Sequence, residues 1–152
     1  MRDHFLKLFK YNDWANRRIG EAVSRNGNAD SKALAILTHV VVVQRLWLDR
    51  IQGVTATYRL WDPLPISEIL ELSEFSTRDW MQFLSVVAPD GWNRRISYTN
   101  SRGVAFVNSL EEVVTQTINH STHHRAQVSL LIRQAGQQPP ALDFISFARN
   151  EE

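Results

Sequence analysis

The chain has 152 residues, a length that suits one domain with a sizeable core, expected to span residues 1–152. Its formal net charge is only +1, which argues against a dedicated nucleic-acid binder, because such proteins usually carry a strong basic patch. The absence of cysteine excludes a disulfide framework, a thiolate metal site and a cysteine nucleophile, so any metal must be held by nitrogen and oxygen ligands.

The chain opens with an amphipathic segment and not with a secretory signal peptide. Residues 3–24 repeat apolar side chains at a period near 3.6, with charged side chains on the other face, which predicts a helix. No apolar run approaches the roughly 18 residues of a membrane span. We therefore expect a soluble, cytoplasmic protein without a membrane partner.

The second predicted helix covers residues 31–52, after a turn at residues 25–30. Val40–Val43 are four consecutive β-branched residues, which by themselves would favour a strand. Because the segment is about twenty residues long and lacks glycine and proline, its length favours a helix. The helix is apolar nearly all round, so it must be buried deeply or on two sides, and a subunit interface is one way to bury the second side.

Two further long helices are predicted in the second half of the chain. Residues 67–87 follow a break that contains two prolines, and Ser67 is the predicted N-cap. Residues 109–134 form the last long helix. It begins with a complete capping box, in which Ser109 and Glu112 satisfy each other's backbone N–H groups.

Shorter elements complete the predicted fold. Residues 95–99 and 104–107 alternate around a glycine-bearing turn, which predicts a small β-hairpin, and residues 141–149 are expected to contain a short helix. The whole pattern predicts an all-α fold, a four-helix bundle with a β-hairpin before the last long helix. The core of such a bundle is a common place for a metal.

A histidine motif lies on the last long helix. Three of the five histidines, His120, His123 and His124, fall within five residues. His120 and His124 are four residues apart and share one helix face, with Cβ atoms about 5–6 Å apart. Two such imidazoles can reach one metal ion, and one more ligand would give a three-ligand site with an open position, as in catalytic zinc sites. His123 falls on another face and is expected at the surface or at an interface.

The third ligand is expected to be His39. Its alternative is His4, in a first helical turn that is prone to fraying. A lone histidine on an apolar helix such as His39 is usually a buried, neutral, hydrogen-bonded residue, but the pair on the last helix lacks a third ligand. The pair itself can be read as a solvated polar stripe. Against that reading, its face also carries Val113, Val114, Thr117, Val128 and Leu131.

Further residues are expected around the three imidazoles. Neutral imidazole ligands need hydrogen-bond acceptors that fix their tautomers. Four residues are close enough in sequence to supply them: Gln116, Thr117, Asn119 and Gln127. Three aromatic residues are expected in the walls of a pocket between the helices: Trp14, Trp47 and Phe106.

The segment Asn119–Gln127, followed by Leu130–Gly136, resembles the signature of the DinB-like, damage-inducible family of metal-dependent proteins. Other segments match this family in the right order: Tyr11–Asn16, Leu37–His39, Tyr98–Gly103 and Pro139–Phe144. Ala126 stands where relatives often have glycine, and because alanine is small and forms helices better, no loss of the site is expected.

The resemblance implies a four-helix bundle with a divalent metal, zinc or nickel. Its ligands are one histidine of the second helix and the pair on the last long helix, here His39, His120 and His124. Homodimers are common in the family. Its members include transferases and isomerases that use a small-molecule thiol, and its name implies no contact with DNA.

Our first hypothesis is a metal-dependent enzyme for a small-molecule substrate, either a hydrolase that activates water or a transferase that activates a low-molecular-weight thiol. The glutamate of the His-Glu-x-x-His motif is missing, which weakens the hydrolase version. Asp13, Asp49 and Glu112 are candidate substitutes for that base, although each is expected to be a surface or capping residue.

Two hypotheses from other classes compete with an enzyme. One is a non-catalytic dimeric binding or structural module with a structural or vestigial metal, suggested by the apolar second helix. The other is nucleic-acid binding through a local patch of Arg94, Arg95, Arg102 and Arg125, which the near-neutral total charge disfavours.

Overall fold

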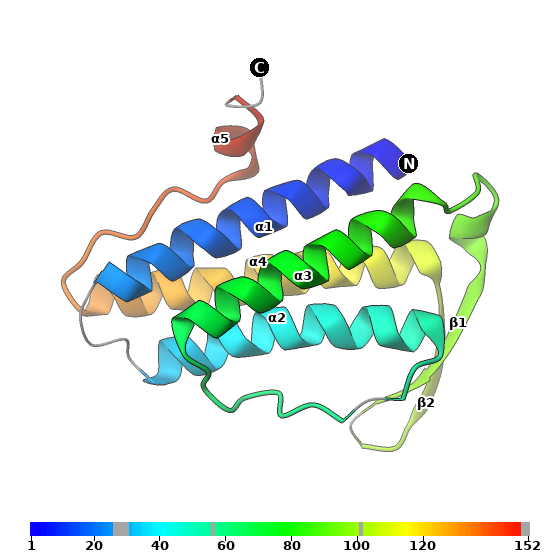
Figure 1. Cartoon of the computed structure of the whole chain (residues 1–152), viewed down its shortest axis with the longest axis horizontal. Coiled ribbons are helices and arrows are strands. Elements are labelled where there is room, and N and C mark those ends of the chain that lie inside the picture. Colours follow the sequence, from blue (N-terminus) through cyan, green and yellow to red (C-terminus); the bar gives the residue numbers. More distant parts are fainter. Residues whose placement is uncertain (26–30, 56, 101, 150–152) are drawn as a thin grey trace.

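A computed structural model describes residues 1–25, 31–55, 57–100 and 102–149 of the chain. The elements in chain order are α1 (Arg2–Arg25), α2 (Ser31–Gln52), α3 (Ile66–Ser85), a short 3-10 turn η1 (Gly91–Asn93), β1 (Arg95–Thr99), β2 (Ala105–Ser109), α4 (Leu110–Gln134) and α5 (Phe144–Ala148). Four long helices lie side by side as a bundle (Figure 1). The predicted all-α bundle with a hairpin before its last long helix is therefore confirmed. The predicted turn at residues 25–30 lies outside the described residues, apart from Arg25.

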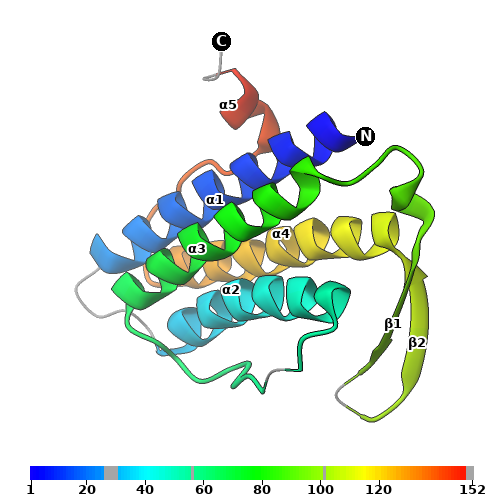
Figure 2. The ribbon, with the colours of Figure 1, turned by 45° about the vertical axis from the view of Figure 1, so that its right-hand side comes forward.

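The helices surround the core in the order α1, α3, α2, α4. The helix α1 packs against α3 and α4, and α2 packs against the same two helices from the opposite side (Figures 1 and 2). An aromatic stack of Phe9 on Trp80, with ring centroids 4.7 Å apart, fills the bundle between α1 and α3. Toward the other end, Ile19, Val41 and Val128 belong to one aliphatic cluster.

The helix α2 is the most apolar element. By length and composition it would be able to cross a membrane, which corrects the expectation that no run approaches that length. Its residues Ile36–Gln44 are all buried inside the protein. The helix has α3 on one side and α4 on the other, and Leu60 and Leu64 of the α2–α3 loop pack against the same core. Burial on several sides within one chain thus accounts for its pattern without a subunit interface.

The predicted N-terminal cap of α4 is confirmed, whereas the predicted N-terminal cap of α3 is wrong. The capping box is present: Glu112 N donates to Ser109 Oγ at 3.1 Å, and Ser109 N donates to Glu112 Oε2 at 2.7 Å. Ser67 is not an N-cap, because α3 already begins at Ile66 with Pro65 as its cap and no side-chain cap hydrogen bond. The fixed φ of proline, here −54°, replaces the capping side chain that the sequence suggested.

The β-hairpin lies at one end of the bundle, where it joins α3 to α4 (Figure 2). Its strands pair antiparallel from Arg95 opposite Ser109 to Thr99 opposite Ala105. The hairpin is attached through Ile96, which is buried in the aromatic half of the core. The expected short helix is also present as α5, beside the N-terminal half of α1.

Candidate metal centre

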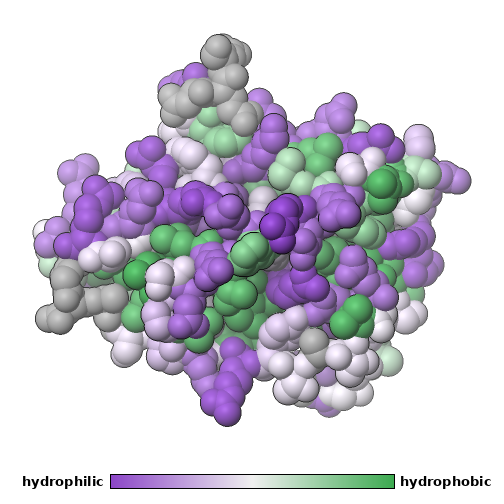
Figure 3. Space-filling model, viewed as in Figure 1, coloured by the Kyte–Doolittle hydropathy of each residue, from purple (hydrophilic) through white to green (hydrophobic). Residues whose placement is uncertain are grey.

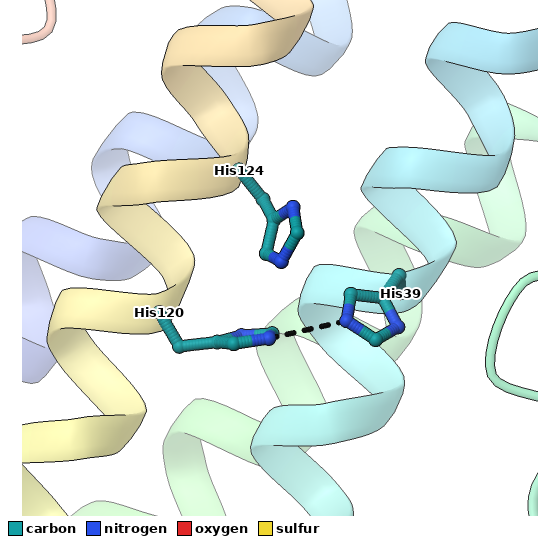
Figure 4. Close-up of side chains that lie close together, drawn as sticks. All are labelled: His39, His120 and His124. Carbon is teal, nitrogen blue, oxygen red and sulfur yellow. Dashed lines mark hydrogen bonds between the residues drawn. The ribbon is translucent and has the colours of Figure 1, made fainter.

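Three histidines from two helices meet between α2 and α4. His39 lies in the middle of α2, and His120 and His124 lie one turn apart on α4. Their possible ligand atoms all lie within 4.8 Å of one another, and Nε2 of His39 is 3.1 Å from Nε2 of His120 (Figure 4). The fold thus brings together the three residues that the sequence nominates as ligands.

The other two histidines of the chain lie apart from this cluster. His4 is exposed in the first turn of α1, where its ring contacts Phe5. His123 is also exposed, and its Nε2 is 3.3 Å from the amide nitrogen of Gln127. Its surface position agrees with the helix register expected from the sequence.

Hydrogen bonds of the outer nitrogen atoms fix the tautomers of two rings. Nδ1 of His39 lies 3.0 Å from the carbonyl oxygen of Leu60, and Nδ1 of His124 lies 2.8 Å from Oε1 of Gln127. Both oxygens accept, so Nδ1 carries the proton in each ring and Nε2 keeps its lone pair. Gln127 was among the expected acceptors, whereas the carbonyl of Leu60 was not foreseen.

His120 has the least complete hydrogen bonding of the three. Because Nε2 of His39 offers a lone pair, Nε2 of His120 must donate to it. Nδ1 of His120 is then unprotonated, and it is buried without a hydrogen-bond partner among the described residues. A buried polar atom without a partner in a native protein calls for an explanation, and an ion at the site is one of the usual ones.

Burial keeps two of the rings neutral. It lowers the pKa of both His39 and His120 from the ordinary value of 6.5 to about 4. For His39, the hydrogen bond to the carbonyl of Leu60 partly opposes this shift. The neighbouring ring of His124 lowers the pKa of both His39 and His120 further, because protonating adjacent rings would bring like charges together. Neutral imidazole is the protonation state that binds a metal near neutral pH, and in His120 the proton on Nε2 would have to move to Nδ1 for Nε2 to serve as a ligand.

The chemistry of the donor set also suits a metal. Among the described residues, the cluster of possible ligands contains three imidazoles and no carboxylate. Imidazole is a good ligand for zinc, nickel, copper and iron and a poor one for magnesium or calcium. The cluster therefore can hold a divalent transition metal, with His39, His120 and His124 as its ligands.

Trp61 covers one face of the site. Its ring lies on the His39 ring with centroids 3.6 Å apart and an interplanar angle of 8°, and its centroid is 5.7 Å from that of the His124 ring in a T-shaped arrangement. About half of its side chain is exposed. Sequence reasoning missed this residue, although an aromatic residue just before Asp62 and Pro63, in a loop with two prolines, was a weak signal of a fixed position.

The aromatic residues expected around the site lie elsewhere. Trp14 packs on Phe147 of α5, and Phe106 stacks on Tyr98 of the hairpin. Trp47 lines a hollow of about 370 Å³ together with Gln116, two turns along α2 from His39. Of the remaining expected acceptors, Asn119 is exposed and Thr117 Oγ1 donates to the carbonyl of Val113 in its own helix.

The three candidate carboxylates are committed to other contacts. Glu112 caps α4 as expected, and Asp13 forms an ion pair with Arg17 at 2.9 Å. Asp49 is not at the surface: only 2% of it is exposed, and it is paired with Arg45 and accepts the hydroxyl of Tyr58. The ion pair with Arg45 and the hydrogen bond from Tyr58 stabilise this buried charge. The sequence did not predict that Asp49 is buried, because both partners were needed to expect it.

Arg125 is buried, which corrects its place in a surface basic patch. Only 1% of it is exposed, and its Nη1 donates to the side-chain oxygens of Asn12 and Asn16 on α1. Asn12 in turn donates to Gln44 of α2, and Asn16 to Ser73 of α3. A buried polar network therefore joins all four helices at the residue that follows His124.

Comparisons with known proteins extend the resemblance of single segments to the whole chain. A model of the DinB family matches residues 1–152. Protein DinB of Bacillus subtilis (strain 168) is 22% identical over 160 residues, covering 95% of this chain and 93% of that protein. The crystal structure of a DinB-like protein from Bacillus cereus ATCC 10987 has a similar fold, with a TM-score of 0.64, 20% identity, and coverage of 91% of this chain and 95% of the other.

Proposed function

The chain belongs to the DinB family, and from this membership and the geometry of the site we propose a metal-dependent enzyme that acts on a small molecule. In this proposal His39, His120 and His124 hold one divalent ion, zinc or nickel. The observation that carries it is the convergence of three imidazoles, without a carboxylate, at a place where one ring has an unpaired buried nitrogen. When bound, such an ion supplies positive charge that lowers the pKa of a water or thiol beside it.

The chain's own residues have distinct roles in this proposal. The carbonyl of Leu60 and the amide oxygen of Gln127 hold the protons of His39 and His124 on Nδ1, so that Nε2 is directed into the cluster. The ring of Trp61 shields His39 from water on one face. Three protein ligands leave a position for a reactant, whereas structural zinc sites are usually closed by four, so a purely structural module is less well supported.

Within this function, transfer from a small-molecule thiol is favoured over hydrolysis. Hydrolytic zinc sites commonly use a carboxylate as general base, and Asp13, Asp49 and Glu112 all make contacts away from the cluster. A thiol has an ordinary pKa of about 8.5, so it loses its proton near neutral pH with much less assistance than water. The chain has no cysteine, so the thiol must come from a diffusible cofactor.

An assay with matched reactants tests this proposal. Protein loaded with zinc or nickel is incubated with chlorodinitrobenzene and either glutathione or bacillithiol, and conjugation is followed by absorbance. We expect turnover that needs both metal and thiol, that is lost in His124→Ala and that persists in His123→Ala. Cleavage of nitrophenyl acetate without a thiol would show hydrolysis instead. Neither reaction in metal-loaded protein would favour a non-catalytic binding module.

We further propose a single domain over residues 1–152 that forms a homodimer in the cytoplasm, as the family resemblance implies. Three exposed apolar side chains of the β-hairpin, Val104, Phe106 and Val107, offer a surface on which a second copy can pack. Light scattering on the purified chain measures the assembly, and a monomer at all concentrations would contradict the dimer.

A further inference from the structure

A large cavity of the described structure is lined by residues other than the three histidines. It has a volume of about 710 Å³ and lies between α2, α3 and the loop that joins them. Figure 3 shows hydrophobic surface in this region, between α3 and α2 in the view of Figure 1. Its residues are Val41, Val42, Arg45, Tyr58, Arg59, Asp62, Pro63, Leu64, Leu72, Phe75 and Ser76. Pockets of roughly 300–1,000 Å³ are typical of small-molecule sites.

The walls of this cavity are mainly apolar. Val41 and Val42 come from α2, Leu64 from the loop, and Leu72 and Phe75 from α3. Leu72 and Phe75 are 40% and 42% exposed, so apolar surface at the rim faces solvent. Burying such surface against an apolar molecule is favourable, at roughly 25 cal/mol per Å².

The charged residues of the cavity are already paired within the chain. Arg45 forms ion pairs with Asp49 at 3.0 Å and with Asp79 at 2.6 Å, and Arg59 pairs with Asp62 at 3.2 Å. An ionic ligand would therefore have to displace an existing pair. The cavity thus favours an uncharged molecule.

Ser76 is the polar group of the cavity that lacks a partner. The residue is 3% exposed, and its hydroxyl oxygen is buried without a hydrogen bond among the described residues. The other hydroxyl in the lining, that of Tyr58, already donates to Asp49. Leaving a buried hydroxyl unpaired costs free energy that a ligand with one hydrogen-bonding group would recover.

We propose that this cavity binds an uncharged small molecule with an apolar body and a single hydroxyl or carbonyl group, which hydrogen-bonds to Ser76. The site is separate from the three histidines but shares a wall with them. The loop that contributes Tyr58 and Leu64 to the cavity also contributes the carbonyl of Leu60 and the ring of Trp61 to His39. A bound molecule therefore rests on the loop that orients one of the predicted ligands.

Equilibrium dialysis of the metal-free, full-length chain with two probes of the same shape tests the proposal. β-Naphthol has an apolar body and one hydroxyl, and naphthalene has the same body without it. We expect both to bind the native protein, and Ser76→Ala to weaken β-naphthol about fivefold, as the loss of one hydrogen bond of about 1 kcal/mol predicts. The affinity for naphthalene should stay within about twofold, since it makes no such bond.

Two blocking variants and one control complete the experiment. Ser76→Leu places a bulky apolar side chain where the ligand's polar group is expected and should weaken binding of both probes. If that variant does not fold, Leu72→Glu places a charge at the exposed rim and should weaken both. Ser85→Leu, on the exposed end of the same helix and outside the cavity, should change neither.

Three results would overturn the proposal. One is that the native chain binds neither probe, and another is that Ser76→Ala affects both probes equally, which would indicate unspecific apolar binding. The third is a dimer, seen by light scattering, that excludes the probes because a second copy of the chain covers the cavity. Since metal is absent throughout, failure here leaves the proposed enzyme activity untouched.

Discussion

Gln127 shows how a single residue outside the cluster controls what the cluster can bind. It is exposed, and its side-chain oxygen accepts a hydrogen bond from Nδ1 of His124 at 2.8 Å. Without this acceptor the imidazole is free to rotate or to adopt the other tautomer, in which Nε2 no longer offers a lone pair.

Gln127→Leu is therefore expected to weaken zinc binding about 10–100-fold, the usual effect of removing a partner of a ligating histidine. The protein should stay as stable as the native chain, because the side chain is on the surface. Competition with a chromophoric chelator measures the affinity. Gln116→Leu, about three turns earlier on the same helix, is the control. An equal loss of zinc affinity in both variants would contradict the role of Gln127.

Arg125 illustrates a residue whose position depends on partners far along the chain. Asn12 and Asn16, which receive its hydrogen bonds, lie 113 and 109 residues away. A side chain that is charged almost always lies at the surface, so the sequence offered no reason to bury this one.

Replacing Arg125 with methionine should lower the free energy of unfolding by about 2–4 kcal/mol, because two buried amide oxygens lose their donor at roughly 1–3 kcal/mol each. Relief of the buried charge offsets part of this cost, since burial already lowers the pKa of Arg125. Urea denaturation of the metal-free chain gives the value. The control Arg133→Met, on the exposed face of α4, should change the free energy of unfolding by less than about 0.5 kcal/mol. If Arg125→Met leaves the free energy of unfolding unchanged, the role of the buried network is contradicted.

Secondary-structure elements were largely predictable because each long helix carries its own periodicity or length signal. Val40–Val43 ended in a helix because their segment is long, and Ser109 with Glu112 fixed the start of α4. The start of α3 was wrongly predicted, with Ser67 as its N-cap. The actual cap is Pro65, which has no side-chain acceptor and was therefore assigned to the loop before the helix. The α2–α3 loop has no period at all, which explains why Leu60 and Trp61 were missed.

The capping box of α4 allows an element-scale prediction. Ser109→Ala removes the acceptor of the Glu112 backbone N–H and should cost about 1 kcal/mol of stability. It should leave metal content unchanged, because His120 lies three turns further along the helix. Thermal unfolding and elemental analysis of the same sample measure both. Ser67→Ala is the matched control and should have little effect, since that hydroxyl caps no helix.

At the scale of the whole molecule, protonation of the histidines makes both stability and metal binding depend on pH. In the metal-free chain the pKa of His39 and His120 is about 4 when folded, below the ordinary value of 6.5 that applies when unfolded. Between these values the unfolded chain binds more protons than the folded one, so lowering the pH favours unfolding.

We therefore expect the metal-free protein to be most stable above about pH 6.5 and to lose stability progressively as the pH falls toward 4. Urea denaturation at a series of pH values follows this loss. The double variant His39→Phe, His120→Phe should show a flatter profile, whereas His4→Ala should retain the slope of the native chain. A native profile that is flat across this range would contradict neutral, buried imidazoles.

Only part of the histidine site was predictable from the sequence. The pair on α4 and the single histidine of α2 follow from helix spacing and from the small number of histidines. The hydrogen bonds that orient them, the tryptophan over His39 and the cavity beside Ser76 depend on how a loop folds back onto the bundle, which no local pattern encodes.

The most direct test of the central claim is elemental analysis of the chain purified without a metal-affinity tag, beside the His39→Ala and His123→Ala variants. The three-histidine site predicts about one zinc or nickel ion per native chain, no bound ion in His39→Ala and an unchanged content in His123→Ala. A native chain that binds no metal even after zinc and nickel are offered and the excess is removed would contradict it, and the three histidines would then be a buried hydrogen-bonded cluster.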